Sequence, residues 1–77
     1  MRMNLCGVLR RIVEASGRSH RDLASSLGMS GTYVSAALTN VCNGKDIGVG
    51  KLVNIADECG YDVEVVSRRT GERIRVD

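Results

Sequence analysis

Residues 19–38, SHRDLASSLGMSGTYVSAAL, predict two short helices joined by a tight glycine turn. Ser19 can cap the first helix, with Asp22 three positions later as its capping-box partner. Gly28 stands where the chain must leave this helix, a position that often requires a positive φ. The expected apolar face of the helix consists of Leu23, Ala24 and Leu27. Local signals therefore predict both the start and the end of this helix.

The second helix of this stretch is expected to follow Ser30, which can cap it, while Met29 fills the core. Its inner face is expected to consist of Val34, Ala37 and Leu38. Two helices separated by a glycine turn of three to four residues form a helix-turn-helix, which places its second helix in the DNA major groove. The sequence therefore predicts a DNA-binding unit whose recognition helix lies within residues 30–40.

Two further amphipathic helices are predicted, one before and one after this unit. The first ends at Gly17. Its apolar positions are Leu5, Val8, Leu9, Ile12 and Val13. A loop over residues 40–47, with the turn signal Asn43-Gly44, precedes the other helix, which Gly60 closes. The apolar face of that helix is expected to consist of Val49, Leu52, Val53, Ala56 and Cys59, and Ile55 makes this face wider. A mainly α bundle of four to five short helices is the expected way to bury these stripes.

After Tyr61 the helical pattern ends, and charged and apolar residues alternate one by one. The same alternation resumes beyond Thr70-Gly71. The sequence therefore predicts a β-hairpin over residues 62–76. Because an isolated hairpin is only marginally stable in water, its open edge is the expected dimer contact. The expected interface residues are Val63, Val65, Ile74 and Val76. The single domain thus divides into a helical DNA-binding bundle, 1–61, and a dimerisation element, 62–77.

A chain of 77 residues allows one domain near the lower size limit of a self-sufficient core, which oligomerisation would help to stabilise. It has no stretch of roughly 18 apolar residues, and its first residues are too charged for a secretory signal, so we expect a cytoplasmic protein without a membrane partner. The net charge is +4 over residues 1–21, −4 over residues 22–66 and +2 over residues 67–77. The positive block leads into the helix-turn-helix, which indicates modest attraction for phosphates.

Three cysteines and one histidine limit the chemistry of the chain. Cys6, Cys42 and Cys59 are odd in number and lack CxxC spacing, so reduced thiols are expected, with Cys42 in a polar loop. The single His20 lacks the partners that a metal site requires. The sequence contains no recognisable nucleophile–base set and no glycine-rich phosphate loop. We therefore expect no enzyme activity, no cofactor and no metal.

Residues 5–66 resemble the helix-turn-helix domains of the Cro and lambda-repressor family, also called XRE-type regulators. The resemblance is carried by the order and spacing of Ser19, Leu23-Ala24, Leu27-Gly28, Met29, Ser30 and Val34-Ser35, and by NGKDIGVGKLVNIADECGYDVEV at 43–65. One departure is His20, where the family usually has Gln. The resemblance implies a dimeric transcriptional regulator of a bacterium, phage or mobile element, and Cro-type proteins use a C-terminal strand for pairing.

The candidate DNA contacts divide into two classes. Base edges are expected to meet residues that the core stripe does not require: Gly31, Thr32, Tyr33, Ser35 and Ala36. Phosphates are expected to meet the start of the first helix of the unit and the loop after the second: Ser19, His20, Arg21, Ser30, Thr39, Asn40, Asn43 and Lys45. Apart from Asn40, residues 30–40 lack long polar side chains, so recognition should depend on methyl contacts, water bridges and DNA shape.

Two functions remain open at this point. The first is a sequence-specific regulator, expected to be a repressor, that binds a short palindromic operator in double-stranded DNA as a homodimer. The second is a small protein-interaction module of the antitoxin or anti-activator type, which keeps the helix-turn-helix shape and uses the uncharged helix face or the hairpin edge to bind a protein partner. The alternative to a DNA contact for His20 is that it is an ordinary surface residue exposed to solvent. The hairpin arginines are expected to protect an open strand edge rather than to touch DNA.

Overall fold

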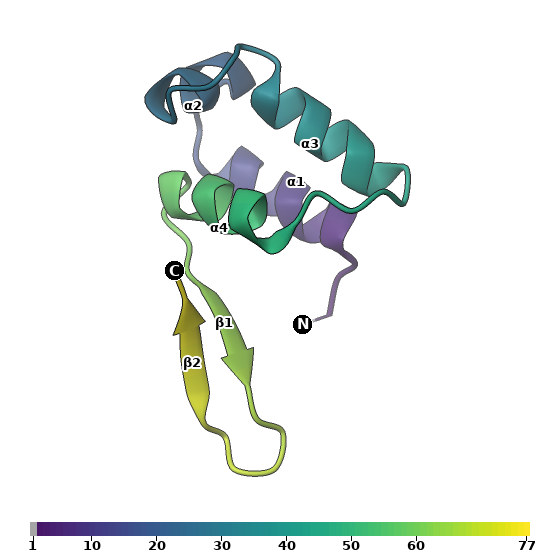
Figure 1. Cartoon of the computed structure of the whole chain (residues 1–77), viewed down its shortest axis with the longest axis vertical. Coiled ribbons are helices and arrows are strands. Elements are labelled where there is room, and N and C mark those ends of the chain that lie inside the picture. Colours follow the sequence, from purple (N-terminus) through teal and green to yellow (C-terminus); the bar gives the residue numbers. More distant parts are fainter. Residues whose placement is uncertain (1) are drawn as a thin grey trace.

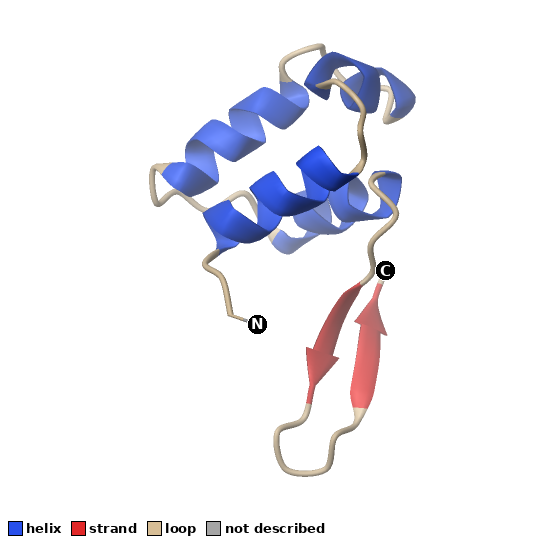
Figure 2. Ribbon diagram, turned by 180° about the vertical axis from the view of Figure 1, so that it is seen from behind, coloured by secondary structure: helices blue, strands red, loops and turns tan. Residues whose placement is uncertain are grey.

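The computed structural model describes residues 2–77, which form four helices followed by a two-stranded antiparallel hairpin (Figure 1). The elements are α1 (Leu5–Ala15), α2 (His20–Ser26), α3 (Tyr33–Cys42), α4 (Val49–Glu58), β1 (Val63–Val66) and β2 (Arg73–Val76). The helices α2 and α3 lie at one end of the molecule, and the hairpin projects from the other end (Figures 1 and 2). The predicted mainly α fold with a C-terminal hairpin is confirmed.

The largest fully buried side chains come one from each helix: Leu9, Leu23, Val34 and Ile55. Ile55, which the sequence placed at the margin of its stripe, is therefore central. Val49 is 62% exposed, and the prediction that it lies in the core is wrong. As the first residue of α4, Val49 lies at the end of the helix, whereas Ile55 lies near its middle where the other helices meet.

Helix α2 begins and ends as its sequence predicts. The Ser19 hydroxyl accepts a hydrogen bond from the Asp22 N–H at 3.0 Å, so Ser19 is the cap. At the other end Gly28 has a φ of 71°, and the N–H groups of Gly28 and Met29 donate to the carbonyls of Ser25 and Ala24. This pair of bonds is a Schellman motif, which satisfies carbonyls that the helix itself leaves free.

The capping box of α2 is not completed, because the Asp22 carboxylate binds Arg18. Arg18 Nε lies 2.7 Å from Asp22 Oδ2, and its Nη1 lies 2.7 Å from Glu58 Oε2 on α4. The hydrogen bonds to Asp22 and Glu58 raise the pKa of the Arg18 guanidinium above its usual value. Arg18 thus connects the start of α2 to the end of α4.

Helix α3 starts later and ends later than the sequence predicts. Thr32, not Ser30, precedes its first residue, and within residues 2–77 the Thr32 side chain makes no capping hydrogen bond. Met29 is 47% exposed, so the prediction that it fills the core is wrong. Gly28 and Met29 both belong to the Schellman turn. Met29 therefore lies in the turn, and α3 begins only after it. At its other end α3 includes Cys42, which the sequence assigned to a loop.

The expectation of three reduced thiols is wrong for two of the cysteines. Cys6 in the first turn of α1 and Cys42 at the end of α3 form a disulfide, with their Cα atoms 4.7 Å apart. Packing of α1 against α3 brings together positions separated by 36 residues, which no local spacing reveals. Cys59 is free and half-buried, and burial raises the pKa of its thiol.

The hairpin has the predicted position and a single register. Val63 lies opposite Val76 and Val65 opposite Ile74, so these four side chains share one face. The other face carries Glu64, Val66, Arg73 and Arg75. On that face, Arg73 Nη2 lies 2.6 Å from Glu64 Oε1. The hairpin is therefore amphipathic, and Val65 and Ile74 on its apolar face are exposed.

Candidate nucleic-acid interface

The turn between α2 and α3 and the outer side of α3 are exposed to solvent. The exposed predicted base-reading residues are Gly31, Thr32 and Ala36, and Ser35 is half-buried. Val34 and Ala37 of the same helix are fully buried, so α3 has a clear inner and outer side. The outer side carries no charge, because residues 33–42 include no Asp, Glu, Lys or Arg. This surface can offer hydroxyl, amide and methyl groups to a partner.

The structure joins two predicted contact residues directly. His20 Nδ1, at the first residue of α2, lies 2.9 Å from Ser35 Oγ on α3. Both side chains line a groove of about 430 Å³ that also runs along α1 and the end of α3. The groove is lined by Arg10, Glu14, His20, Ser35, Leu38, Thr39, Cys42 and Asn43. Four of the predicted site residues, His20, Ser35, Thr39 and Asn43, therefore share one concave surface.

Arg10 and Glu14 are the residues of this groove that sequence reasoning missed. The sequence places both on the wet side of the first helix, one turn apart, with no sign that α1 runs beside α3. Together they give the groove one cation and one carboxylate. An anion in the groove would meet Arg10 favourably and Glu14 unfavourably, so backbone N–H groups and hydroxyls would have to contribute much of the binding.

Gly31 lies beside the side chain of Arg21. A Cβ at this position would lie 3.2 Å from Nε of Arg21, so the Arg21 side chain occupies the space beside the glycine. The guanidinium of Arg21, on α2, therefore lies beside the turn that precedes α3. This places a predicted phosphate-binding cation next to predicted base-reading residues.

Tyr33, a predicted base-reading residue, also contacts the core and α4. It is half-buried against the core, and Nζ of Lys51 on α4 lies 5.1 Å from the centre of its ring. Such an arrangement is a cation–π contact. The core stripe predicted from the sequence did not include Tyr33, so its contacts with the core and with α4 were not foreseen.

The remaining predicted phosphate contacts differ in exposure. Ser19, Ser30 and Lys45 are exposed, whereas Asn40 is half-buried. The Asn40 carbonyl accepts hydrogen bonds from the N–H groups of Lys45 and Asn43, which closes the end of α3. Asn40 therefore shapes the loop that presents Asn43 and Lys45.

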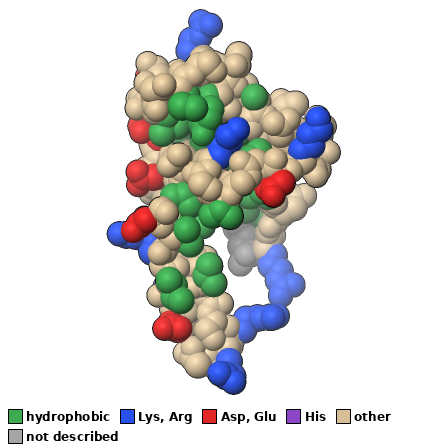
Figure 3. Space-filling model, viewed as in Figure 1, with side chains coloured by type: hydrophobic (Ala, Val, Ile, Leu, Met, Phe, Trp, Pro, Cys, Tyr) green, Lys and Arg blue, Asp and Glu red, His purple; other side chains and the backbone are tan. Residues whose placement is uncertain are grey.

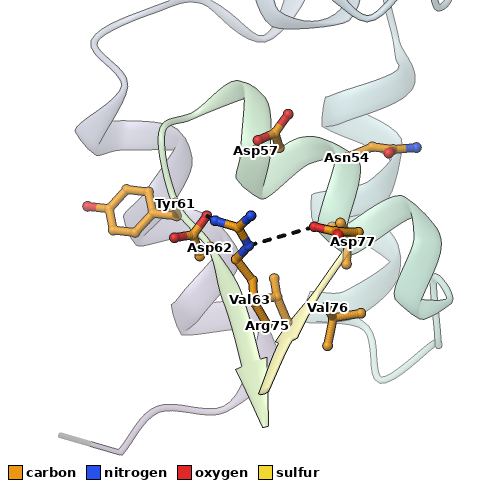
Figure 4. A pocket seen from close by; sticks show the side chains of 9 residues that line it. Asn54, Asp57, Tyr61, Asp62, Val63, Arg75, Val76 and Asp77 are labelled. Carbon is orange, nitrogen blue, oxygen red and sulfur yellow. Dashed lines mark ion pairs between the residues drawn. The ribbon is translucent and has the colours of Figure 1, made fainter. Parts of the chain in front are cut away.

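A second hollow, of about 260 Å³, lies between α4 and the base of the hairpin (Figure 4). In it Arg75 lies between two carboxylates, with Nη1 3.9 Å from Asp62 Oδ1 and Nε 3.7 Å from Asp77 Oδ1 (Figure 4). Asp57 adds a further carboxylate to the lining. The excess of acid makes this hollow unsuitable for phosphate, in contrast to the groove beside α3.

The hairpin residues predicted as a dimer interface are exposed to different degrees. Val65 and Ile74 are 60% and 56% exposed, while Val63 and Val76, nearer the helices, are half-buried. Apolar side chains are visible on the hairpin and again where it meets the bundle (Figure 3). The outer half of the apolar face is thus open to a partner.

Residues 2–77 contain no cluster of three or more His, Cys, Asp or Glu side chains that could hold a metal ion. None of the helices described here has both the length and the apolar character that a membrane crossing requires. Comparison with known proteins found no matching family model, curated protein or solved structure.

Proposed function

We propose that this chain is a sequence-specific DNA-binding regulator of the Cro and lambda-repressor type, acting as a homodimer and most simply as a repressor. The observation that carries the proposal is the pair α2–α3. Its Schellman turn at Gly28 connects two helices, and the second has a buried inner side and an uncharged, exposed outer side. That combination suits insertion of α3 into the major groove of double-stranded DNA.

Groups suited to phosphates surround this helix. Arg21 lies against the turn, His20 stands at the start of α2, and Asn43 and Lys45 follow the end of α3. The Thr32 side chain accepts no hydrogen bond from the N–H groups in the first turn of α3, which leaves this end suited to a phosphate oxygen. These contacts would fix the orientation of α3, whereas base edges would meet Thr32, Ser35 and Ala36.

In the proposed complex, recognition of the DNA sequence depends on short side chains. Ala36 and the Thr32 methyl can contact thymine methyl groups, and the hydroxyls of Thr32 and Ser35 can bond to either kind of base pair. Shape and flexibility of the DNA would supply the rest of the specificity. The proposed function also places the protein with DNA in the cytoplasm, where disulfides are rare, so binding should be measured with and without reductant.

The alternative, a protein-interaction module, is favoured by the absence of charge on the outer side of α3 and by the neutral balance of the adjoining groove. The two functions differ in their response to salt. Neutralised phosphates release counterions, so affinity for DNA must fall steeply as salt rises, whereas an apolar protein contact should change little.

The test is selection of bound duplexes from a random-sequence library, followed by a salt series on the enriched duplex. We expect a palindromic motif whose half-sites lie about one helical turn apart, and a loss of affinity of at least tenfold between 50 and 200 mM salt, both on the order expected for a dimer with several phosphate contacts. An unenriched library, or an affinity that does not respond to salt, would contradict the proposal.

A further inference from the structure

The Cys6–Cys42 disulfide is a reactive group to which the proposed function assigns no role. Cys42 is exposed to solvent, whereas Cys6 is half-buried. Cys42 also lines the groove beside α3, together with Thr39 and Asn43. Because thiol–disulfide exchange depends on access to a sulfur atom, the Cys42 side of this bond is open to a small thiol that enters the groove.

The two cysteines of the bond lie at opposite kinds of helix end. Cys6 is the second residue of α1, and Cys42 is the last residue of α3. The positive end of a helix dipole stabilises a thiolate, and the negative end destabilises one. Cys6 is therefore the better leaving group of the two, because a more stable thiolate departs from a disulfide more readily.

Arg10 adds a cation on the Cys6 side of the bond. It follows Cys6 by four positions, so it lies on the same face of α1, and its side chain lines the groove. Glu14, the carboxylate of the groove, lies one turn further along α1. Along the helix axis, a thiolate on Cys6 is thus closer to the cation of the groove than to its carboxylate.

We propose that this disulfide is a thiol–disulfide exchange site, at which a small thiol attacks Sγ of Cys42 and Cys6 leaves as a thiolate. A bond forms between the incoming sulfur and Cys42 as the Cys6–Cys42 bond breaks, and the electron pair of that bond passes to Cys6. A second small thiol then attacks the incoming sulfur, releases Cys42 as a thiolate and departs as the oxidised small disulfide. The protons of the two small thiols pass to the two cysteines, so the disulfide is reduced as the small thiols are oxidised.

The first step changes the groove as well as the bond. The covalent link between α1 and α3 is lost, and the small thiol attached to Cys42 occupies the groove that His20 and Ser35 also line. The consequence for DNA binding rests on the proposed function, whereas the exchange itself does not. If this surface meets DNA, thiolation of Cys42 obstructs it, and DNA binding responds to the thiol pool. Redox sensing is a usual role of the disulfides that do form in the cytoplasm.

The exchange is tested on the parent chain in the absence of DNA, with reduced glutathione as the small thiol. Excess N-ethylmaleimide, added at timed intervals, blocks every thiol and preserves the mixed disulfides, which peptide mass spectrometry then locates. We expect glutathione on Cys42 and maleimide on Cys6, in excess over the reverse arrangement by roughly tenfold or more. The matched control is Cys59→Ser, which removes the third thiol and should give the same ratio.

The same reaction in concentrated guanidinium chloride removes the helices and leaves the sequence unchanged. The preference for Cys42 should then nearly disappear, because neither the helix ends nor the difference in burial remain. Equal labelling in the folded protein, an excess of glutathione on Cys6, or no mixed disulfide at all would overturn the proposal. A ratio that guanidinium does not change, or that is lost in Cys59→Ser, would overturn it as well. Since no DNA is present, each outcome is independent of whether α2–α3 binds DNA.

Discussion

Loss of the Cys6–Cys42 disulfide is expected to lower the free energy of unfolding by about 4 kcal/mol, the chain-entropy value for a closed loop of this length. The loop spans 36 residues and includes all of α2 and almost all of α3. A domain of this size has a total stability on the order of 4–12 kcal/mol, so the change is a large fraction of the whole. The midpoint of thermal unfolding should fall by roughly 15–30 °C.

The measurement is thermal unfolding of the parent and of Cys42→Ser, each with and without dithiothreitol. Reductant should destabilise the parent and leave Cys42→Ser unchanged. The matched control is Cys59→Ser, which removes the free thiol and should keep the full response to reductant. Equal midpoints for the parent with and without reductant would show that the bond does not stabilise the fold in solution.

Ala36→Glu is expected to weaken binding to the enriched duplex by about 100-fold or more. Ala36 is exposed on the outer side of α3, so its substitution leaves the core intact. A carboxylate there would meet the acceptor groups of base edges and the field of the phosphates, and it would replace an apolar contact with a thymine methyl group. In a dimer the penalty occurs in both half-sites.

The matched control is Asn54→Glu, which makes the same change of charge on an exposed position of α4, beside the hairpin. It should keep an affinity within a few-fold of the parent. Fluorescence anisotropy with a labelled duplex measures both variants, and circular dichroism verifies that each remains folded. Equal affinities for Ala36→Glu and Asn54→Glu would remove α3 from the interface.

Local signals in the sequence were sufficient for the order of the elements. Ser19 caps α2, Gly28 takes the positive φ that ends it, and alternating valines form β1 where predicted. Each of these features depends on residues within a few positions of one another. The sequence could therefore predict the helix-turn-helix shape and the hairpin without knowledge of the packing.

Features that depend on contacts between distant elements were not predictable in this way. The disulfide requires α1 to lie beside α3, and the burial of Tyr33 requires α4 to lie beside the start of α3. The same limitation applies to Arg10 and Glu14, which join the groove only because of how α1 packs. Ile55 lies at the centre of the core because the four helices meet there. The apolar pattern of one helix cannot show which of its residues will be buried most deeply.

Amide chemical-shift mapping during titration with the enriched duplex tests most directly whether α2–α3 is the DNA-binding surface. We expect the largest changes at the start of α2, in the turn through Gly31 and Thr32, and along Ser35, Ala36 and Thr39. Residues of the hairpin turn, Arg68 to Gly71, should change little. Changes confined to the hairpin or to α4, with α3 unaffected, would contradict the proposed interface.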